Sequence, residues 1–539
     1  MTSLNTLSPP NSPIRDRRPS MIDEELTNSV QDILDRCPRF RILVLGKAGA
    51  GKSSVINAAF GVTDAHVSHS RVGESDIYQE ITSRENPRFV LHDSKGFATG
   101  EVNNLQTVKR FIDEKAQPIV DIRDKLHAIW CTWESLRHVH IIDVTLFRYC
   151  IEIPTENGAL FEVADSEFMK MDLQKVPVIV VFTKFDLLVS KLEMEAADSL
   201  DDDDDELTDD QYREISLKAE DIFQRTCVEP LRKTLADHDI PMIPYIRVST
   251  RNQYKDTLVE LTKVTKDQLD EAVWLIWAFA QRASADLKID ACIRIGQRKY
   301  WRGLASSLNF PGMTLRKCVE ALHNEMVAVW NFDDPRMILL SDDFRMLMSH
   351  LVNRMSDGTN PMERLISVAE FVGQIGAAVP TAGLIAVPVA AFAQWVLTVY
   401  SDAPVVLRQL MAYITDLTIV MQSLYWIIQA RSASAGTIST TRGAVDRRAV
   451  RLAFKAYRES GDCTRVHNEI RAFVRSTTAF RRNQRDVVLE KVIELIRNNR
   501  FEPPESYKQR SKESGPVLNE NEDEYWYFAE PEGMSDLGH

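Results

Sequence analysis

The sequence predicts a three-layer α/β domain with a mostly parallel sheet, followed by an all-α domain. Short apolar runs such as residues 40–45 and 176–182 are rich in β-branched side chains, which is typical of buried parallel strands. Stretches of helical character separate these runs. Beyond residue 265 the apolar residues recur with helical spacing, as they do over residues 267–293. A chain of 539 residues is also too long for a single hydrophobic core.

The first strand, residues 40–45, leads into a glycine-rich loop. This loop matches the phosphate-binding pattern G-x-x-x-x-G-K-[ST] at every position, and residues 54–60 after it have the pattern of a helix. Backbone N–H groups in such a loop cradle phosphate oxygens at the positive end of the helix. We therefore expect the loop to bind a nucleoside triphosphate. The predicted phosphate-binding residues are Gly46, Lys47, Ala48, Gly49, Ala50, Gly51, Lys52, Ser53 and Ser54.

The second strand, residues 88–92, ends in a D-x-x-G motif. In phosphate-loop enzymes the loop lysine reaches the β- and γ-phosphates and the loop hydroxyl ligates Mg²⁺, which assigns these roles to Lys52 and Ser53. Asp93 is expected to hold the same ion through a water, and the backbone N–H of Gly96 to contact the γ-phosphate. Lys52 and Gly96 are therefore the predicted catalytic residues.

A third magnesium ligand is expected between the phosphate loop and the second strand. Ser75 lies just before residues 77–82, which have the pattern of a strand. We predict that Ser75 is the switch residue, the one that closes on Mg²⁺. Thr63, Ser68 and Ser70 are the competing choices.

Two later strands end in residues suited to recognise guanine. Residues 176–182 are followed by the motif [NT]-K-x-D, and residues 243–248 are followed by Ser-Thr-Arg. The carboxylate of Asp186 can accept hydrogen bonds from guanine N1 and N2, a donor pair that adenine lacks, and the Lys184 stem can pack over the base. A backbone N–H after the last strand would contact guanine O6. The predicted base-binding residues are Thr183, Lys184, Asp186, Ser249 and Thr250.

The order of these motifs resembles that of P-loop GTPases of the translation-factor-related class over roughly residues 39–265. It also resembles fungal G-domain-containing proteins with a helical C-terminal region. The resemblance implies a G domain that binds GTP and GDP with Mg²⁺. Phe97 stands where Ras-like proteins carry the glutamine that orients the attacking water, so hydrolysis is expected to be slow. We expect a slow GTPase switch coupled to a helical effector or membrane-associating domain. The alternative is a non-hydrolysing, GTP-gated scaffold.

Charge is segregated along the chain, although the net charge is −13. Residues 193–210 hold eleven acidic and no basic side chains, while residues 442–500 hold fifteen Lys and Arg against seven Asp and Glu. The basic region lacks interleaved aromatic residues and any nucleic-acid-binding signature, so no nucleic acid is expected as a partner. The seven cysteines form no C-x-x-C pair, which argues against zinc and disulfide frameworks and favours a cytoplasmic protein.

The predicted domains are a disordered segment at residues 1–38, a G domain at 39–265, a helical domain at 266–500 and an acidic, largely disordered tail at 501–539. Residues 371–401 carry no charge. We interpret them either as a buried helical hairpin or as a membrane-inserting one, in which case the basic region would face anionic lipid. Self-association or a protein effector would supply further partners.

Two insertions are predicted in the G domain, at residues 131–148 and 190–211. Residues 125–130 and 149–154 each read as half of one central strand, so the first insertion is expected to interrupt that strand after Trp130. One hypothesis is a retained intron. The other is a genuine surface insertion in which residues 140–147 form the strand.

Overall fold

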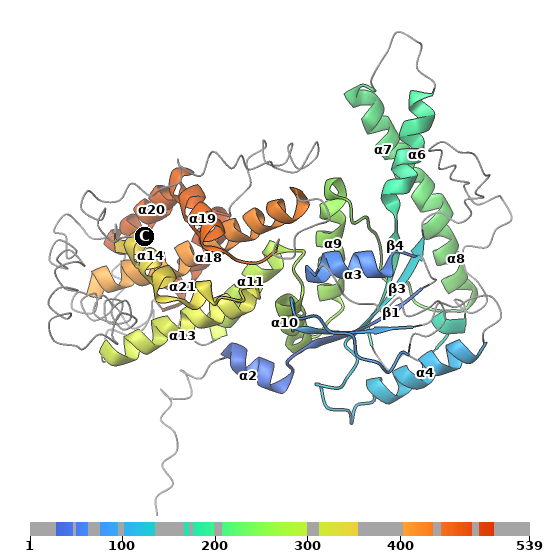
Figure 1. The fold of residues 1–539 in the computed structure, drawn as a ribbon, viewed down its shortest axis with the longest axis horizontal. Helices are drawn as coiled ribbons and strands as arrows, with labels where there is room; N and C mark the ends of the chain where they lie inside the picture. Colours follow the sequence, from blue (N-terminus) through green and yellow to red (C-terminus); the bar gives the residue numbers. More distant parts are fainter. Residues whose placement is uncertain are drawn as a thin grey trace, which may run out of the picture.

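The computed structural model has two parts, a sheet flanked by helices and a helical body formed by the later half of the chain (Figure 1). It describes residues 29–46, 50–62, 76–94, 102–134, 167–171, 176–198, 207–298, 312–353, 403–434, 443–476 and 485–500.

Five parallel strands form the sheet, in the order β2-β1-β3-β4-β5. They are β1 (Phe40–Leu45), β2 (Phe89–Asp93), β3 (Ala128–Glu134), β4 (Val178–Thr183) and β5 (Tyr245–Arg247). Residues 77–82, predicted as a strand, contribute instead an isolated antiparallel bridge between Ile81 and Leu91. Because the five strands run in one direction, the loops that follow them gather at one edge, where open α/β sheets bind ligands.

Helices cover both faces of the sheet, as the alternation of side chains along β1 requires. Phe40, Ile42 and Val44 face one core, whereas Leu43 and Leu45 face the other. The first core includes α3 (Lys52–Phe60), α9 (Lys255–Asp267) and α10 (Glu271–Ala280). The second includes α4 (Val102–Ala116), α6 (Phe185–Ala197), α7 (Asp209–Phe223) and α8 (Glu229–Asp237). The predicted three-layer α/β architecture is therefore confirmed.

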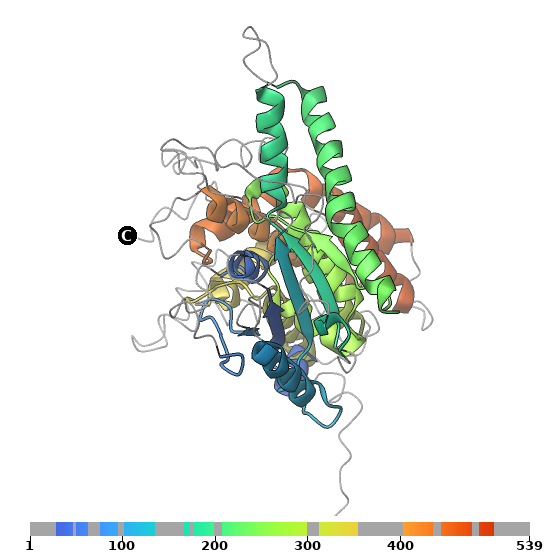
Figure 2. The same cartoon turned by 90° about the vertical axis from the view of Figure 1, so that its right-hand side faces the viewer.

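The helices α6 and α7 project from the sheet as an arm (Figures 1 and 2). Thr208 caps α7 through a reciprocal pair of hydrogen bonds with Gln211, and a π-helical turn at Gln224–Val228 joins α7 to α8. The segment predicted as an insertion at residues 190–211 thus extends two helices of the domain, as far as the structure describes it.

The central strand β3 differs from its prediction. Residues 131–134 continue the strand beyond Trp130, and their pairing with β4 ends with Glu134 opposite Thr183. The expected break after Trp130 is therefore wrong, because the first four residues of the supposed insertion complete the ladder that β4 requires. The rest of that segment, residues 135–148, lies outside the described residues, as does the proposed continuation at residues 149–154.

Where the structure describes the later half of the chain, its regular elements are helices, as predicted. Its central helix, α18, is packed among α11, α13, α14, α19, α20 and α21. Within the described part of the chain, Arg408–Arg431 of α18 is the stretch long and apolar enough to cross a bilayer, and 94% of its most apolar window is buried inside the protein. The uncharged segment 371–401 lies outside the described residues. The helices are α11 (Ala285–Arg298), α13 (Gly312–Trp330), α14 (Asp342–Asn353), α18 (Ala403–Ser434), α19 (Arg447–Glu459), α20 (Asp462–Ser476) and α21 (Arg485–Asn498).

Two predicted boundaries need correction. Residues 29–36 of the supposedly disordered N-terminal segment form helix α2 (Ser29–Arg36), whose Val30 N–H donates to the buried carboxylate of Glu325 at 3.1 Å. The boundary at residue 265 falls inside α9. The helical pattern of residues 267–293 is also divided between α10 and α11 by residues 281–284, where Ser284 Oγ accepts from the Leu287 N–H.

Helix α10 belongs to the core of the sheet. Its Trp277 ring lies 4.9 Å from the ring of Phe40, 5.6 Å from that of Phe60 and 5.8 Å from that of Trp130. Trp277 is fully buried, and its indole N–H donates to the Thr262 carbonyl at 3.0 Å. The sheet therefore depends on residues that lie after the predicted end of the G domain.

Arg282, in the turn after α10, joins the two parts of the molecule. Its N–H donates to the Ala59 carbonyl near the end of α3 at 2.8 Å, and its guanidinium donates to the Glu85 carbonyl at 2.8 Å. Its own carbonyl accepts from Tyr425 Oη at 3.2 Å and Gln429 Nε2 at 3.1 Å, both on α18. Burial lowers the pKa of Arg282 to about 10. One residue thus connects the helix after the phosphate loop with the central helix of the helical body.

A buried polar cluster also links three helices of the helical body. Asp416 on α18 accepts from Tyr457 Oη of α19 at 2.6 Å and from His467 Nε2 of α20 at 2.8 Å. All three residues are nearly or fully buried. Burial alone would lower the pKa of His467, but the charge of Asp416 and its hydrogen bond raise that pKa to about 10. The cluster is therefore an ion pair between His467 and Asp416 at neutral pH.

Candidate nucleotide-binding site

The phosphate loop connects β1 to α3 at the carboxyl edge of the sheet. Gly46 has φ 146° and Gly51 has φ 77°, values that L side chains rarely adopt, so both positions favour glycine. Helix α3 begins at Lys52, which places Ser53 and Ser54 in its first turn at the positive end of the helix dipole. The loop residues 47–49 lie outside the described residues.

Lys52 and Asp93 lie close enough to influence each other. Lys52 Nζ donates to the Gly46 carbonyl at 2.8 Å, which folds the side chain back over the loop. Burial lowers the pKa of Lys52, and the nearby charge of Asp93 opposes that shift. Asp93, 8% exposed, ends β2 directly beside Val44 of β1. The predicted phosphate-binding cation and the predicted magnesium-binding carboxylate therefore share one site.

The segment before β2 is held by hydrogen bonds from side chains of β1 and β2. His92 Nδ1 donates to the Ile77 carbonyl at 2.8 Å, and Arg41 donates to His92 Nε2 at 2.8 Å and to Glu80 at 2.6 Å. Burial lowers the pKa of His92 to about 4, so the ring stays neutral and keeps this pattern of donor and acceptor nitrogens. The chain that follows the predicted switch residue Ser75 is thus anchored beside Asp93.

The predicted base-binding motif is bonded directly to the loop between β1 and α3. Thr183 Oγ1 donates to the Ala50 carbonyl at 2.8 Å, and both residues are buried. Gly51 packs on the same threonine, because a Cβ added to Gly51 would lie 3.5 Å from Thr183 Cβ. The end of β4 and the phosphate loop therefore form one unit.

Lys184 and Asp186 lie at the start of α6. Lys184 has φ 58° and ψ 33°, a left-handed conformation that is uncommon outside glycine and that recurs at functional sites. This turn brings Asp186 into the first turn of α6 with its side chain 10% exposed. Phe185 between them packs under the Arg247 guanidinium, which lies 4.6 Å from the ring centroid.

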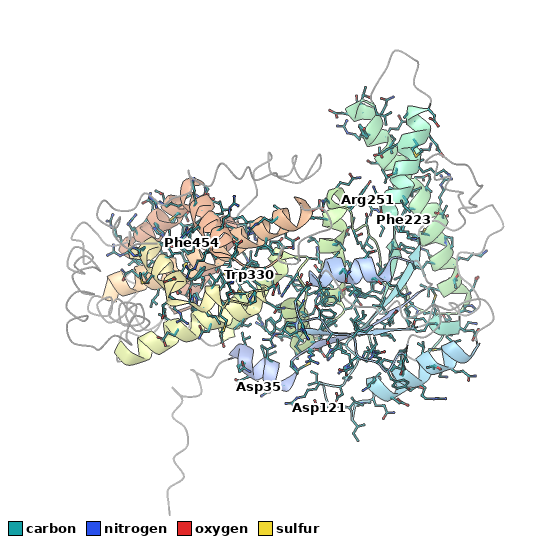
Figure 3. All side chains as sticks on the ribbon, in the orientation of Figure 1. Asp35, Asp121, Phe223, Arg251, Trp330 and Phe454 are labelled. Carbon is teal, nitrogen blue, oxygen red and sulfur yellow. The ribbon has the colours of Figure 1, made fainter. Side chains whose placement is uncertain are left out.

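Arg251 is a site residue that the sequence prediction omitted. Its Nε donates to Asp186 Oδ2 at 2.8 Å, and its side chain is 61% exposed. Figure 3 shows Arg251 near the foot of the α6–α7 arm. Its position as the third residue of the Ser-Thr-Arg tripeptide was the available signal, because a cation there lies opposite the carboxylate at the end of the neighbouring strand.

The loop after β5 presents its backbone toward the same edge. The Ser249 N–H donates to Thr257 Oγ1 at 3.1 Å, and Ser249 Oγ accepts from the Arg251 N–H at 3.1 Å. Thr250 lies between them and is exposed. Of the two predicted O6-binding positions, Ser249 therefore holds the loop and Thr250 faces solvent.

Several predicted site residues lie outside the described residues. They include Ser75 and its competitors, and also Gly96 and Phe97. Within the described part, no cluster of three or more His, Cys, Asp or Glu could hold a metal ion. The described oxygen donors are the Ser53 hydroxyl and the Asp93 carboxylate, and hard oxygen donors suit Mg²⁺, which keeps several waters when a nucleotide supplies the remaining ligands.

Comparison with known proteins adds little about the ligand. A family model described as "Domain of unknown function (DUF8505)" matches residues 338–512, which include α14 and α18 to α21. No curated protein matches the chain. Among solved structures, the chain is similar to a dimerization-deficient mutant of Toc33 from Arabidopsis thaliana, with 17% identity, a TM-score of 0.23, and coverage of 43% of this chain and 80% of that one. So low a score does not identify what this chain binds.

Proposed function

We propose that this chain binds GTP and GDP with Mg²⁺ and acts as a slow guanine-nucleotide switch. The observation that carries the proposal is the hydrogen bond from Thr183 to Ala50. It joins a loop suited to phosphate and a motif suited to guanine at one edge of the sheet. A phosphate loop alone would leave the base undetermined.

Each described residue has a role in this proposal. Lys52 neutralises phosphate charge, and Ser53 and Asp93 hold Mg²⁺, which screens the phosphate charge when bound. Asp186 accepts from guanine N1 and N2, and its partial burial strengthens those bonds. The exposed Thr250 supplies the backbone N–H for O6, because the N–H groups of its neighbours are already used within the loop.

Slow hydrolysis is proposed from Phe97, because an apolar side chain at that position cannot orient a water. The proposed catalytic residues are Lys52 and Gly96.

The helical body would sense the nucleotide through Arg282, which bonds to both α3 and α18. A non-hydrolysing scaffold remains the competing function. The proposed setting is cytoplasmic, with a protein effector or a membrane as the partner of the helical body.

Competition binding tests the proposal. The full chain should bind a fluorescent GDP, and unlabelled GDP or GTP, but not ADP or ATP, should displace it. Removal of Mg²⁺ should weaken GTP binding. The variant Asp186→Asn should lose GDP and gain xanthosine diphosphate, because an amide presents one acceptor and one donor to the base. Equal displacement by ADP and GDP would disprove guanine selection. Turnover measured with and without added lipid then separates a slow GTPase from a scaffold.

A further inference from the structure

We propose that Arg251 competes with guanine for the carboxylate of Asp186 and so accelerates nucleotide release. This inference rests on the proposed function, since it assigns a regulatory residue to the same site. It starts from the ion pair between Arg251 Nε and Asp186 Oδ2, at 2.8 Å.

The two donors have the same chemistry. Guanine presents N1–H and the exocyclic N2–H₂ to a carboxylate as a planar fork around one carbon. The guanidinium of Arg251 presents Nε–H and a terminal N–H₂ as the same kind of fork, which matches carboxylate geometry. The Arg251 guanidinium therefore resembles the donor edge of guanine, and it bonds to the same carboxylate that guanine would need.

The side chains of Asp186 and Arg251 differ in how firmly they are held in place. The Asp186 side chain is 10% exposed and fixed in the first turn of α6, whereas the Arg251 side chain is 61% exposed. The Arg251 backbone is held by its N–H bond to Ser249 Oγ and by the Tyr254 N–H, which donates to the Arg251 carbonyl at 2.9 Å. Only the side chain has to turn into solvent for guanine to take its place, and because it is already 61% exposed it loses little burial in doing so.

Displacing Arg251 from Asp186 should change guanine affinity by a measurable amount. Exposed ion pairs contribute modestly, and Arg251 is more than half exposed, so displacing it should weaken guanine binding by about two- to five-fold. As the base leaves, Arg251 takes over the carboxylate, so Asp186 exchanges one donor pair for another. We therefore expect faster release than in a chain without this arginine.

Dissociation kinetics of fluorescent GDP from the full chain test the inference. Arg251→Ala and Arg251→Gln should each bind GDP about two- to five-fold more tightly, mainly through slower release. The gain should shrink at high salt, because salt screens the competing ion pair in the wild type. Arg213→Ala on the arm removes an exposed arginine paired with Asp210 and serves as the charge control, with no change expected. Unchanged or weaker binding in both Arg251 variants would overturn the inference.

A second background separates competition from a general charge effect. In Asp186→Asn, with xanthosine diphosphate as the ligand, Arg251→Ala should have little effect, because the carboxylate is gone. An equal gain in both backgrounds would show that Arg251 hinders nucleotide binding independently of the Asp186 carboxylate and would also overturn the inference. If the wild type binds no guanine nucleotide, the proposed function fails as well. If it binds GDP but the Arg251 variants do not differ from it, the failure is confined to Arg251.

Discussion

The two ends of helix α3 use polar groups in opposite ways. At its N-terminus, Lys52 and Ser53 are half-buried and follow the glycine-rich loop that is expected to bind phosphate. At its C-terminus, Arg282 bonds to Ala59 and Glu85 in a buried junction, and Asn86 Nδ2 donates to the carbonyls of Phe60 and Ala280 at 2.8 Å each. At the first end, the proposed ligand would replace the bond that Lys52 now makes to the Gly46 carbonyl, whereas at the second end the donors are bonded to carbonyls of neighbouring segments. Changes at the first end should therefore affect binding, and changes at the second should affect stability.

The largest effect is expected at the buried end. Arg282→Ala removes the guanidinium donors to the Glu85 and Gly61 carbonyls and leaves a cavity, and we expect a loss of about 3 kcal/mol in the free energy of unfolding. Denaturant unfolding of the full chain measures this loss. Arg213→Ala, which is exposed on the arm, should stay within about 0.5 kcal/mol of the wild type. Because the backbone bonds of Arg282 to Ala59, Tyr425 and Gln429 survive this substitution, a loss as small as that of the control would show that the guanidinium contributes little to the junction.

A second buried junction should make stability depend on pH. The folded-state pKa of His467 is about 10, above its ordinary value of 6.5. A raised pKa means that the Asp416 pair stabilises the fold fully below about pH 6.5 and loses that contribution as pH rises toward 10. Unfolding measured from pH 6 to pH 10 should show a loss on the order of 2 kcal/mol. The same slope in His467→Gln would assign the loss to other groups.

At the N-terminal end of α3, Lys52→Ala should lower GTP affinity while leaving the free energy of unfolding nearly unchanged. It removes a charged donor to phosphate, so GTP affinity should fall by at least about tenfold. Unfolding free energy should change by less than about 1 kcal/mol, since a partly buried charge is also removed. Isothermal titration and denaturant unfolding of the same sample give both values. A loss of stability that exceeds the loss of binding would contradict the comparison of the two ends.

The smallest effect is expected at Thr183, where one substitution should lower both stability and GTP binding. Thr183→Val keeps the shape of the side chain but cannot donate to the Ala50 carbonyl. Both the free energy of unfolding and the free energy of GTP binding should fall by about 1 kcal/mol. Thr183→Ser, which retains the hydroxyl, should restore most of each. Failure of serine to restore binding would mean that the methyl group, rather than the hydrogen bond, positions the loop.

The residues of the proposed ligand site could be predicted from the sequence because their signals are local. The phosphate-loop glycines and the carboxylate at Asp186 occupy fixed positions relative to their strands, so the motif and the strand end together locate them. The all-α region was likewise predicted from its apolar spacing. The role of Trp277 on the sheet was missed, because a helical period does not say which surface a helix covers.

The junction could not be predicted for a related reason. Arg282 acts through backbone carbonyls that belong to distant segments, and no residue type marks a carbonyl as a partner. A partial signal existed at Ser284, since serine before Ala285-Asp286-Leu287 is typical of a helix start. The continuation of β3 past Trp130 was missed because residues 149–154 offered an apparent continuation of the same strand, whereas pairing with β4 selects residues 131–134, which include the strand-favouring Thr132 and Trp133.

The arm has a mechanical consequence for the base site. Asp186 lies in the first turn of α6, and Phe223, the last residue of α7, packs against Phe185 with ring centroids 6.1 Å apart. Helix α6 is about 20 Å long, and its first turn carries Asp186, the proposed guanine-binding carboxylate. Met194 and Tyr212 are exposed farther along the arm. A partner that bound those side chains and tilted α6 would therefore move Asp186 relative to the loop between β1 and α3.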